Sequence, residues 1–312
     1  MRKILSPLLL LVFVLGSFTQ FSPASAQDDQ NTSTAQFLEI NPAKLDFVVQ
    51  RGTVTRQEVT ITNKNAGKVA LKASFENVLP NGENGETKPA NEPTPYDLKK
   101  FSTVGNPDFT LAPRESRKVQ VSINVPANES PGGYYGILRF SPTERSDLPP
   151  VAVKADIATL FLVRVPGPVT EAGSIKEAYA AKADGGKVGG IFLGNQLNLV
   201  TKINNGGNVH FGTAPTFQTS DQFGKSGLKA TLESRNIFPK SDRRFEATWP
   251  GIGSGLHTVT VSADLPNKPA QQQTFKVLVI TPLVAGLIAL VLVILVALII
   301  LGRRRKKARS RL

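Results

Sequence analysis

The sequence predicts an all-β fold, with two immunoglobulin-like β-sandwich domains in tandem and one transmembrane α-helix near the C-terminus. Three observations support this. Short runs that alternate apolar and polar residues fill most of residues 36–280, and clusters rich in Gly, Pro and Asn separate them. A single long apolar stretch follows at residues 283–301. Between the two ends, only one short segment has a pattern that favours a helix.

The N-terminus reads as a signal peptide over residues 1–26. Two basic residues, Arg2 and Lys3, precede an apolar run at residues 8–15, which is too short to cross a bilayer. A small-residue pattern then predicts cleavage. The positions that define this site are Ala24, Ala26 and Gln27, with the cut before Gln27. The alternative is an uncleaved N-terminal anchor, but the small-residue pattern favours cleavage.

The first sandwich is expected over residues 36–168, after a polar lead-in at residues 27–35 that lacks apolar periodicity. In residues 54–62, Val59 and Ile61 fall on one face and charged residues on the other, as in a half-buried antiparallel strand. Residues 79–96 contain two Asn-Gly pairs and four prolines. They are expected to form a surface loop with a small hairpin.

The last strand of this domain is expected within residues 151–165. Its centre, residues 157–163, is apolar on both faces, so we expect both faces to be covered. The Pro-Gly-Pro sequence at residues 166–168 then marks the domain boundary.

The second sandwich, residues 169–280, repeats features of the first. Residues 203–209 resemble residues 61–69, and residues 238–240 resemble residues 112–114. Two sandwiches of one plan explain these echoes, although similar turn chemistry can also arise by chance. Residues 174–183 are predicted as a short helix, with Ser174 and Glu177 as a capping box.

The C-terminal end predicts a membrane anchor over residues 281–302. The 19 uncharged residues 283–301 span about 28 Å as a helix, close to the hydrocarbon thickness of a bilayer. A basic tail, residues 303–312, follows. Its topogenic residues include Arg303, Arg304, Arg305, Lys306 and Lys307. Because basic clusters stay in the cytoplasm, the tail is expected inside and residues 27–280 outside the cell membrane.

The formal charge of +13 has a topological origin. Two of the 37 basic residues lie in the signal peptide and seven in the tail, which leaves 28 basic against 24 acidic residues outside. The ectodomain is therefore only mildly basic, and no nucleic-acid partner is expected. The chain has no cysteine, which excludes disulfides, a lipoprotein anchor and thiolate metal sites.

No catalytic motif is present. The sequence lacks HExxH, GxSxG, a Walker loop and GxGxxG, and we expect no enzyme activity, metal site or cofactor. The two histidines, His210 and His257, lie among apolar residues without a nucleophile pattern, which favours structural roles. Scattered carboxylates leave open an unrecognised cell-wall hydrolase.

Tyr134 and Tyr135 are the candidate binding residues. They follow a double glycine and open a strand, so one is expected to face the core and the other outward, where it could stack on a sugar or anchor a protein. A tyrosine packed on a sheet face is the alternative. Residues 79–96 and the sandwich edge strands are further candidates for recognition.

The first domain resembles that of bacterial WxL-interacting proteins. The likeness rests on Arg51-Gly52 with VTRQEVTITN, on LAPRESRKVQVSINVP, and on GGYYGILRF followed by VKADIATLFLVRV. The resemblance covers roughly residues 37–165. It implies a bacterial cell-surface protein with a peptidoglycan-binding first domain, a second β domain and a transmembrane helix.

The predicted function is therefore that of a non-enzymatic, membrane-anchored protein that binds peptidoglycan, a WxL-type surface protein, or both. The alternative is a membrane-tethered assembly chaperone that holds a partner strand at a sandwich edge.

Overall fold

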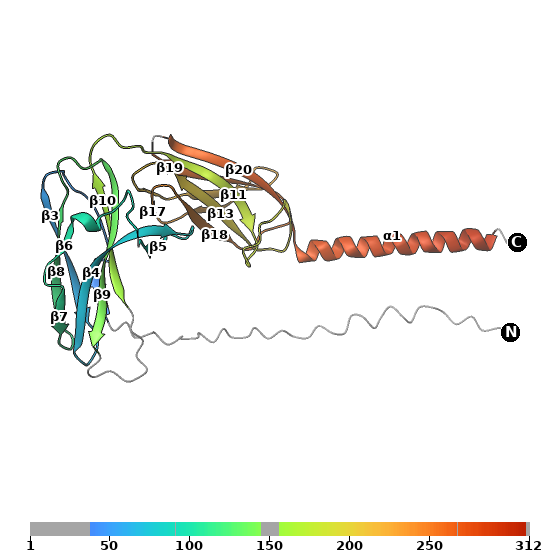
Figure 1. The fold of residues 1–312 in the computed structure, drawn as a ribbon. Coiled ribbons are helices and arrows are strands. Elements are labelled where there is room, and N and C mark those ends of the chain that lie inside the picture. Colours follow the sequence, from blue (N-terminus) through green and yellow to red (C-terminus); the bar gives the residue numbers. More distant parts are fainter. Residues whose placement is uncertain (1–37, 91, 145–155, 267, 310–312) are drawn as a thin grey trace. The chain divides into compact units, whose positions relative to one another are not determined.

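The computed structural model describes residues 38–90, 92–144, 156–266 and 268–309. These residues form two β-sandwiches and one C-terminal helix, which confirms the predicted fold class (Figure 1). The predicted signal peptide, its cleavage positions Ala24, Ala26 and Gln27, and the lead-in at residues 27–35 lie outside the described residues.

The first sandwich consists of two antiparallel sheets with one parallel strand at an edge. The first sheet has the order β1 (Leu38–Asn41), β3 (Val54–Asn63), β8 (Ser116–Asn124) and β6 (Ser102–Val104). The second has the order β2 (Lys44–Val48), β10 (Ile157–Val165), β9 (Gly132–Glu144), β4 (Val69–Asn81) and β5 (Glu86–Pro89), and β7 (Asp108–Leu111) also pairs with β4. A 3-10 turn, η1 (Lys99–Phe101), precedes β6.

The core of this sandwich follows the predicted alternation. Val59 and Ile61 of β3 have no exposed surface and pack in the same core as Phe140 and Phe161 of the opposite sheet. Burying each such side chain stabilises the fold by roughly 1.5–3 kcal/mol. The apolar faces therefore hold the two layers together without disulfides.

The second sandwich follows after the Pro-Gly-Pro sequence. One sheet has the order β11 (Gly173–Ala181), β13 (Leu197–Asn205) and β18 (Ser241–Trp249). The other has the order β12 (Ile191–Leu193), β20 (Lys268–Ile280), β19 (Gly255–Leu265), β15 (Thr216–Ser220) and β16 (Ser226–Thr231), and β14 (Phe211–Thr213) pairs with β17 (Arg235–Ile237). The core contains Phe217, Trp249 and Val259.

A buried asparagine turn occurs once in each sandwich. In the first, Asn63 Nδ2 donates to the carbonyl oxygen of Gly67 (2.8 Å), and Asn63 Oδ1 accepts the N–H of Asn65 (2.9 Å). In the second, Asn205 Nδ2 donates to the carbonyl oxygen of Val209 (2.8 Å), and Asn205 Oδ1 accepts the N–H of Gly207 (2.9 Å). The spacings of two and four residues are the same in both.

Each of these asparagines also holds a more distant strand end. Asn63 Nδ2 donates to the carbonyl oxygens of Leu111 (3.3 Å) and Ala112 (3.0 Å), and Asn205 Nδ2 donates to that of Ile237 (2.9 Å). Arg114, three residues after Leu111, has φ 64°, and Lys240, three residues after Ile237, has φ 56°. The echoes noted in the sequence therefore mark one structural element that is built twice.

The predicted helix at residues 174–183 is wrong, because this segment is strand β11. It pairs antiparallel with β13 from Gly173 to Ala181, with a register shift between Ile175 and Glu177. The ladder satisfies the backbone groups and places Ala180 in the core. Pairing and burial outweigh the weak helical propensity of SIKEAYAAKA.

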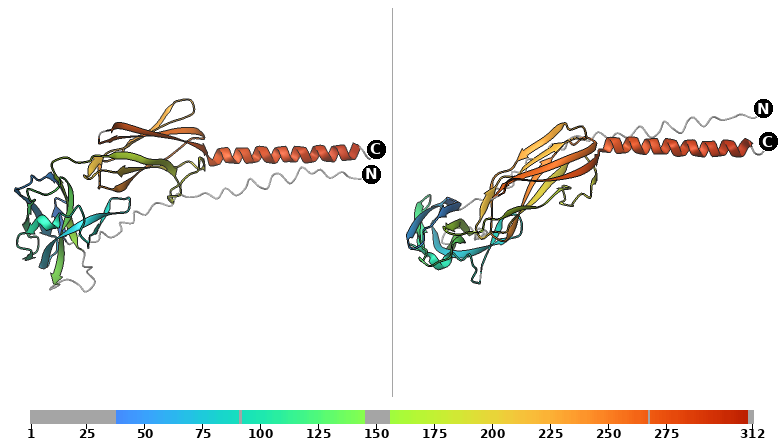
Figure 2. Two further views of the ribbon diagram at one scale, coloured as in Figure 1. Left: turned by 45° about the horizontal axis from the view of Figure 1, so that its top comes forward. Right: turned by 90° about the horizontal axis from the view of Figure 1, so that it is seen from above.

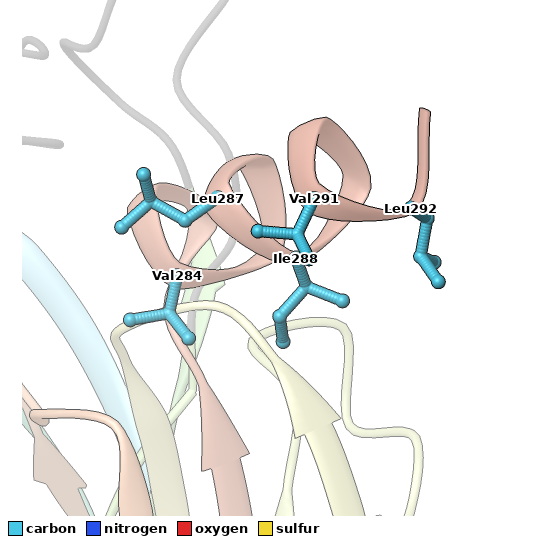
Figure 3. A pocket seen from close by; sticks show the side chains of 5 residues that line it. All are labelled: Val284, Leu287, Ile288, Val291 and Leu292. Carbon is cyan, nitrogen blue, oxygen red and sulfur yellow. The ribbon is translucent and has the colours of Figure 1, made fainter. Parts of the chain in front are cut away.

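Helix α1 (Pro282–Arg309) follows β20 almost directly, with only Thr281 between them (Figure 2). The most apolar 18-residue stretch within Pro282–Arg303 has a mean hydropathy of 3.5, and this stretch is not buried in the protein. The helix is therefore long and apolar enough to cross a membrane, and it continues past the predicted end of the span into the basic tail. Figure 3 shows side chains of Val284, Leu287, Ile288, Val291 and Leu292, which line a shallow apolar hollow on this helix.

Candidate functional site at the strand edge beside the sandwich contact

The outer face of β9 and β10 is covered by residues of the second sandwich. Leu162 of β10 and Tyr135 of β9 are buried in one apolar cluster with Val78 and with Phe238. The ring centroids of Tyr135 and Phe238 are 4.9 Å apart in an edge-on arrangement. Since Phe161 of β10 lies in the core of the first sandwich, the prediction that this strand is covered on both faces is confirmed.

The hydroxyl group of Tyr135 joins the two sandwiches through His210. It accepts the backbone N–H of His210 (2.9 Å) and lies 3.2 Å from His210 Nδ1. On the other side of the ring, His210 Nε2 lies 3.0 Å from Asp46 Oδ1, and Asn236 Nδ2 donates to Asp46 Oδ2 (2.8 Å). Every polar atom of this chain of contacts has a partner when His210 is neutral and carries its proton on Nε2.

This network disfavours a positive charge on His210. Burial lowers the pKa of His210 below its ordinary value of 6.5, although the nearby carboxylate of Asp46 opposes part of the effect. For Asp46, burial acts to raise the pKa, but the hydrogen bonds from His210 and Asn236 outweigh it and the pKa is lowered. If Nδ1 were also protonated, the Tyr135 hydroxyl group would lose its acceptor.

The hairpin formed by β4 and β5 contacts the β11–β13–β18 sheet of the second sandwich. The carbonyl oxygen of Glu83 accepts the backbone N–H of Arg244 in β18 (2.7 Å), and the Glu83 carboxylate pairs with Lys202 Nζ (2.8 Å). Gly85 lies so close to the guanidinium group of Arg243 that an added Cβ would be 1.5 Å from it. The small hairpin expected in residues 79–96 is present, but its tip contacts this chain's own second sandwich.

β18 is an edge strand, and its outer side continues beyond the hairpin. Because the N–H of Arg244 points away from β13, the period of two places the N–H groups of Glu246 and Thr248 on the same outer side. Both side chains are exposed, whereas Phe245, Ala247 and Trp249 are buried. Within the described part of the chain, no strand pairs with this side of β18.

The candidate binding residues Tyr134 and Tyr135 are both buried, at 3% and 1% relative exposure. The expectation that one of them is exposed is therefore wrong. Tyr134 packs in the first core, and its hydroxyl group donates to Glu129 Oε1 (2.8 Å), which raises its pKa together with burial. Tyr135 does lie on the opposite face, but Phe238 and His210 cover it. Neither ring is placed to stack on a ligand.

The preceding glycine explains the position of Tyr135. A Cβ on Gly133 would lie 1.9 Å from the Tyr135 hydroxyl oxygen, so the ring occupies the space that a side chain would need. The N–H of Gly133 donates to the carbonyl oxygen of Asn208 (2.9 Å) in the second sandwich. The sequence signal was the double glycine before two tyrosines, but its partner lies more than 70 residues away.

Among the described residues, no group of three or more His, Asp or Glu side chains is placed to hold a metal ion. The residues that sequence reasoning missed are Glu83, Glu246 and Thr248. They could be found only once the partner of the hairpin tip was known.

No known family model and no curated protein matches this chain. Among solved structures, it is similar to a chain from a chaperone–tip adhesin complex of CFA/I fimbriae, with 13% identity over 76% of this chain and 97% of that one, and a TM-score of 0.41. It is also similar to the class 5 fimbriae chaperone CfaA, with 14% identity over 77% and 99% and a TM-score of 0.41. A third similar structure is the E. coli chaperone DraB, with 13% identity over 77% of this chain and 96% of that one, and a TM-score of 0.34. These scores lie below 0.5, so the function has to be argued from this chain's own residues.

Proposed function

We propose that this chain is a single-pass membrane protein whose two-sandwich ectodomain holds an extended segment of a protein partner at the outer edge of β18. The observation that carries the proposal is the hydrogen bond from the Arg244 N–H to the Glu83 carbonyl oxygen. It shows that a backbone can approach this edge at hydrogen-bonding distance. The N–H groups of Glu246 and Thr248 continue the same row and are available to a partner strand.

The edge suits an extended peptide better than a sugar. Strand addition needs a row of unpaired backbone donors and acceptors with exposed side chains alternating beside them. Glu246 and Thr248 supply that alternation, since the residues between them are buried. A saccharide site of the kind expected from Tyr134 and Tyr135 has no support in the geometry, because both rings are covered.

The anchor and the orientation belong to the same proposal. With helix α1 in the membrane, one end of the second sandwich would lie at the bilayer surface, because only Thr281 separates β20 from Pro282. The basic residues after the span and the predicted signal peptide support an orientation with the ectodomain outside and the tail in the cytoplasm. The protein acts by binding and without catalysis.

The test compares two variants at one position in the full-length chain. Thr248→Ala removes the side chain and keeps the N–H, whereas Thr248→Pro removes the N–H as well, on the side that β13 does not use. A photo-crosslinking residue at Glu246 in living cells reports the partner. We expect the cross-linked product to persist in Thr248→Ala and to be lost in Thr248→Pro. Equal cross-linking in both variants contradicts strand addition.

The same variants can be tested for peptidoglycan binding. If the detergent-solubilised full chain sediments with purified peptidoglycan, and Thr248→Pro sediments equally, the wall is the ligand and the β18 edge is not its site. The resemblance to WxL-interacting proteins supplies a specific partner to try. A WxL-domain protein mixed with the chain is expected to bind it in a manner that Thr248→Pro abolishes.

A further inference from the structure

Exposed apolar side chains of the ectodomain gather at one end of the second sandwich. Outside α1, the described residues include six exposed large apolar side chains, with exposures from 38% for Leu256 to 86% for Phe223. They are Val48, Val54, Ile191, Leu193, Phe223 and Leu256. The last four belong to the second sandwich, and strand register shows that all four lie where β20 enters α1.

Two of the four lie on β12, which pairs with the last residues of β20. Ile191 is opposite Leu278, and Leu193 is opposite Ile280, two residues before the helix begins. Their exposures are 64% and 69%, whereas Phe192 between them packs against the core. The N–H of Gly194 donates to the carbonyl oxygen of Ile280 (3.0 Å), which fixes β12 beside the exit of the chain.

β19 and the β15–β16 hairpin carry the other two. Leu256 of β19 is opposite Leu278, so Leu256, Leu278 and Ile191 form one row across three strands. Ser220 of β15 is opposite Thr258 of β19, and the hairpin continues from there towards the Leu256 row. Phe223 lies in the turn of this hairpin and is 86% exposed.

Polarity changes along the outer face of β20. The outward residues Gln272, Thr274 and Lys276 are polar, and the next two outward residues, Leu278 and Ile280, are apolar. On β19 the residue opposite Lys276 is Thr258, and the residue opposite Leu278 is Leu256. At about 3.4 Å per residue, the apolar rows at Ile280 and Leu278 lie about 7 Å and about 14 Å along the strand from the start of the helix.

From this placement we infer that the end of the second sandwich is itself a lipid-binding surface, with Ile191, Leu193, Leu256 and Phe223 seated in the interfacial region of the bilayer. The inference rests on the proposed membrane anchoring by α1. Lipid is the occupant because these rows are continuous with the apolar span: only Thr281 separates Ile280 from Pro282. Interfacial segments bury apolar side chains about 5–10 Å deep, which includes the row at Ile280, and the row at Leu278 comes within this depth where the strand is tilted from the bilayer normal.

The polar groups at this end are compatible with lipid headgroups. Lys225 lies two residues from Phe223, and Lys182 and Lys187 lie in the connection between β11 and β12. Asp184 and Asp221 are acidic residues of the same end, and Lys187 also pairs with the carboxylate of Glu177 in β11 (3.1 Å). Asp221 Oδ1 accepts the N–H groups of Phe223 and Lys225, so it holds the turn that presents the phenylalanine.

The absence of cysteine from the chain makes a labelling test direct. Single substitutions Phe223→Cys and Leu193→Cys in the full chain carry an environment-sensitive fluorophore. The protein is reconstituted into vesicles of phosphatidylcholine and phosphatidylglycerol, with or without doxyl-labelled lipid. Gln272→Cys on the polar part of the outer face serves as the aqueous control. Ile288→Cys in α1 reports the anchor.

We expect the labels at Phe223 and Leu193 to shift to shorter wavelength and to lose most of their emission to the doxyl lipid, while the label at Gln272 stays accessible to iodide. Labels at Phe223 and Leu193 that remain open to iodide overturn the inference. The inference is also overturned if both labels are shielded from iodide and from doxyl lipid, and if this shielding increases with the protein-to-lipid ratio. A second copy of the chain then covers this surface. If the Ile288 label is itself unquenched by lipid, the anchoring proposal fails, and the lipid-binding surface fails with it. Unchanged emission from Trp249 confirms that each variant is folded.

Discussion

The asparagine turn that occurs in both sandwiches predicts that replacing either asparagine destabilises the sandwich that contains it. Asn205 is fully buried, and its amide group makes three hydrogen bonds: to the carbonyl oxygens of Val209 and Ile237 and from the N–H of Gly207. In Asn205→Ala, these buried backbone groups lose their partner and water cannot replace it. At about 1 kcal/mol net for each bond, the free energy of unfolding of the second sandwich falls by about 3 kcal/mol.

The chain's single tryptophan allows the unfolding of the second sandwich to be measured separately. Trp249 lies in the second core at 6% exposure, so its emission follows the unfolding of that sandwich, while far-ultraviolet circular dichroism follows both. With a urea dependence of about 1–3 kcal/mol per molar, a loss of about 3 kcal/mol lowers the midpoint of the Trp249 transition by about 1–3 M. The measurement uses the full chain in detergent micelles.

Asn63→Ala is the matched variant in the first sandwich. It removes the bonds to Gly67 and Ala112, so it is expected to lower the circular-dichroism midpoint while it affects the Trp249 transition less. Asn124→Ala, on an exposed position of β8, is the control. If Asn205→Ala moves the Trp249 midpoint no more than Asn124→Ala does, the turn is not a stabilising element and the argument from duplication is refuted.

Three further predictions concern the contact between the sandwiches. Tyr135→Phe leaves the buried N–H of His210 without an acceptor and is expected to cost about 1–3 kcal/mol, measured as a lower urea midpoint; a change no larger than that of Asn124→Ala would contradict it. Gly133→Ala should destabilise the chain further, because its Cβ would displace the Tyr135 hydroxyl group, and combining it with Tyr135→Phe should recover part of the loss. Since the pKa of His210 is lowered in the folded chain, the folded state binds fewer protons, and stability should fall as the pH drops below about 6.5. The lowered pKa of Asp46 adds a further loss below about pH 4, and in His210→Gln the first step should be absent from the pH dependence of the urea midpoint.

The features that sequence reasoning captured are those set by neighbours along the chain. Val59 and Ile61 alternate with charged residues, so the buried face of β3 follows from strand geometry alone. The repeated asparagine turns were visible as echoes because their hydrogen bonds span only two to four residues. The apolar run at residues 157–163 also indicated a strand covered on both faces, although not what covers its second face.

The features that it missed depend on partners far away in the sequence. One of Tyr134 and Tyr135 is expected to be exposed, because no residue near them in the sequence indicates that Phe238, about 100 residues later, covers Tyr135. The segment SIKEAYAAKA has helical propensity, and only its pairing with β13 makes it a strand. The tip of the β4–β5 hairpin contacts β18 through Glu83, a residue that looks like an ordinary surface carboxylate in the sequence.

The two sandwiches share a plan but differ in where they carry an apolar outer face. In the first, the outer face of β9 and β10 is apolar at Tyr135 and Leu162, and the second sandwich covers it. In the second, the outer face of β19 and β20 is polar along most of its length and becomes apolar only at Leu256, Leu278 and Ile280. An apolar outer face is stable only when it is shielded from water, and in the first sandwich residues of the second sandwich shield it. Because the apolar rows of the second sandwich begin two residues from a helix that can span a membrane, we propose that lipid covers them.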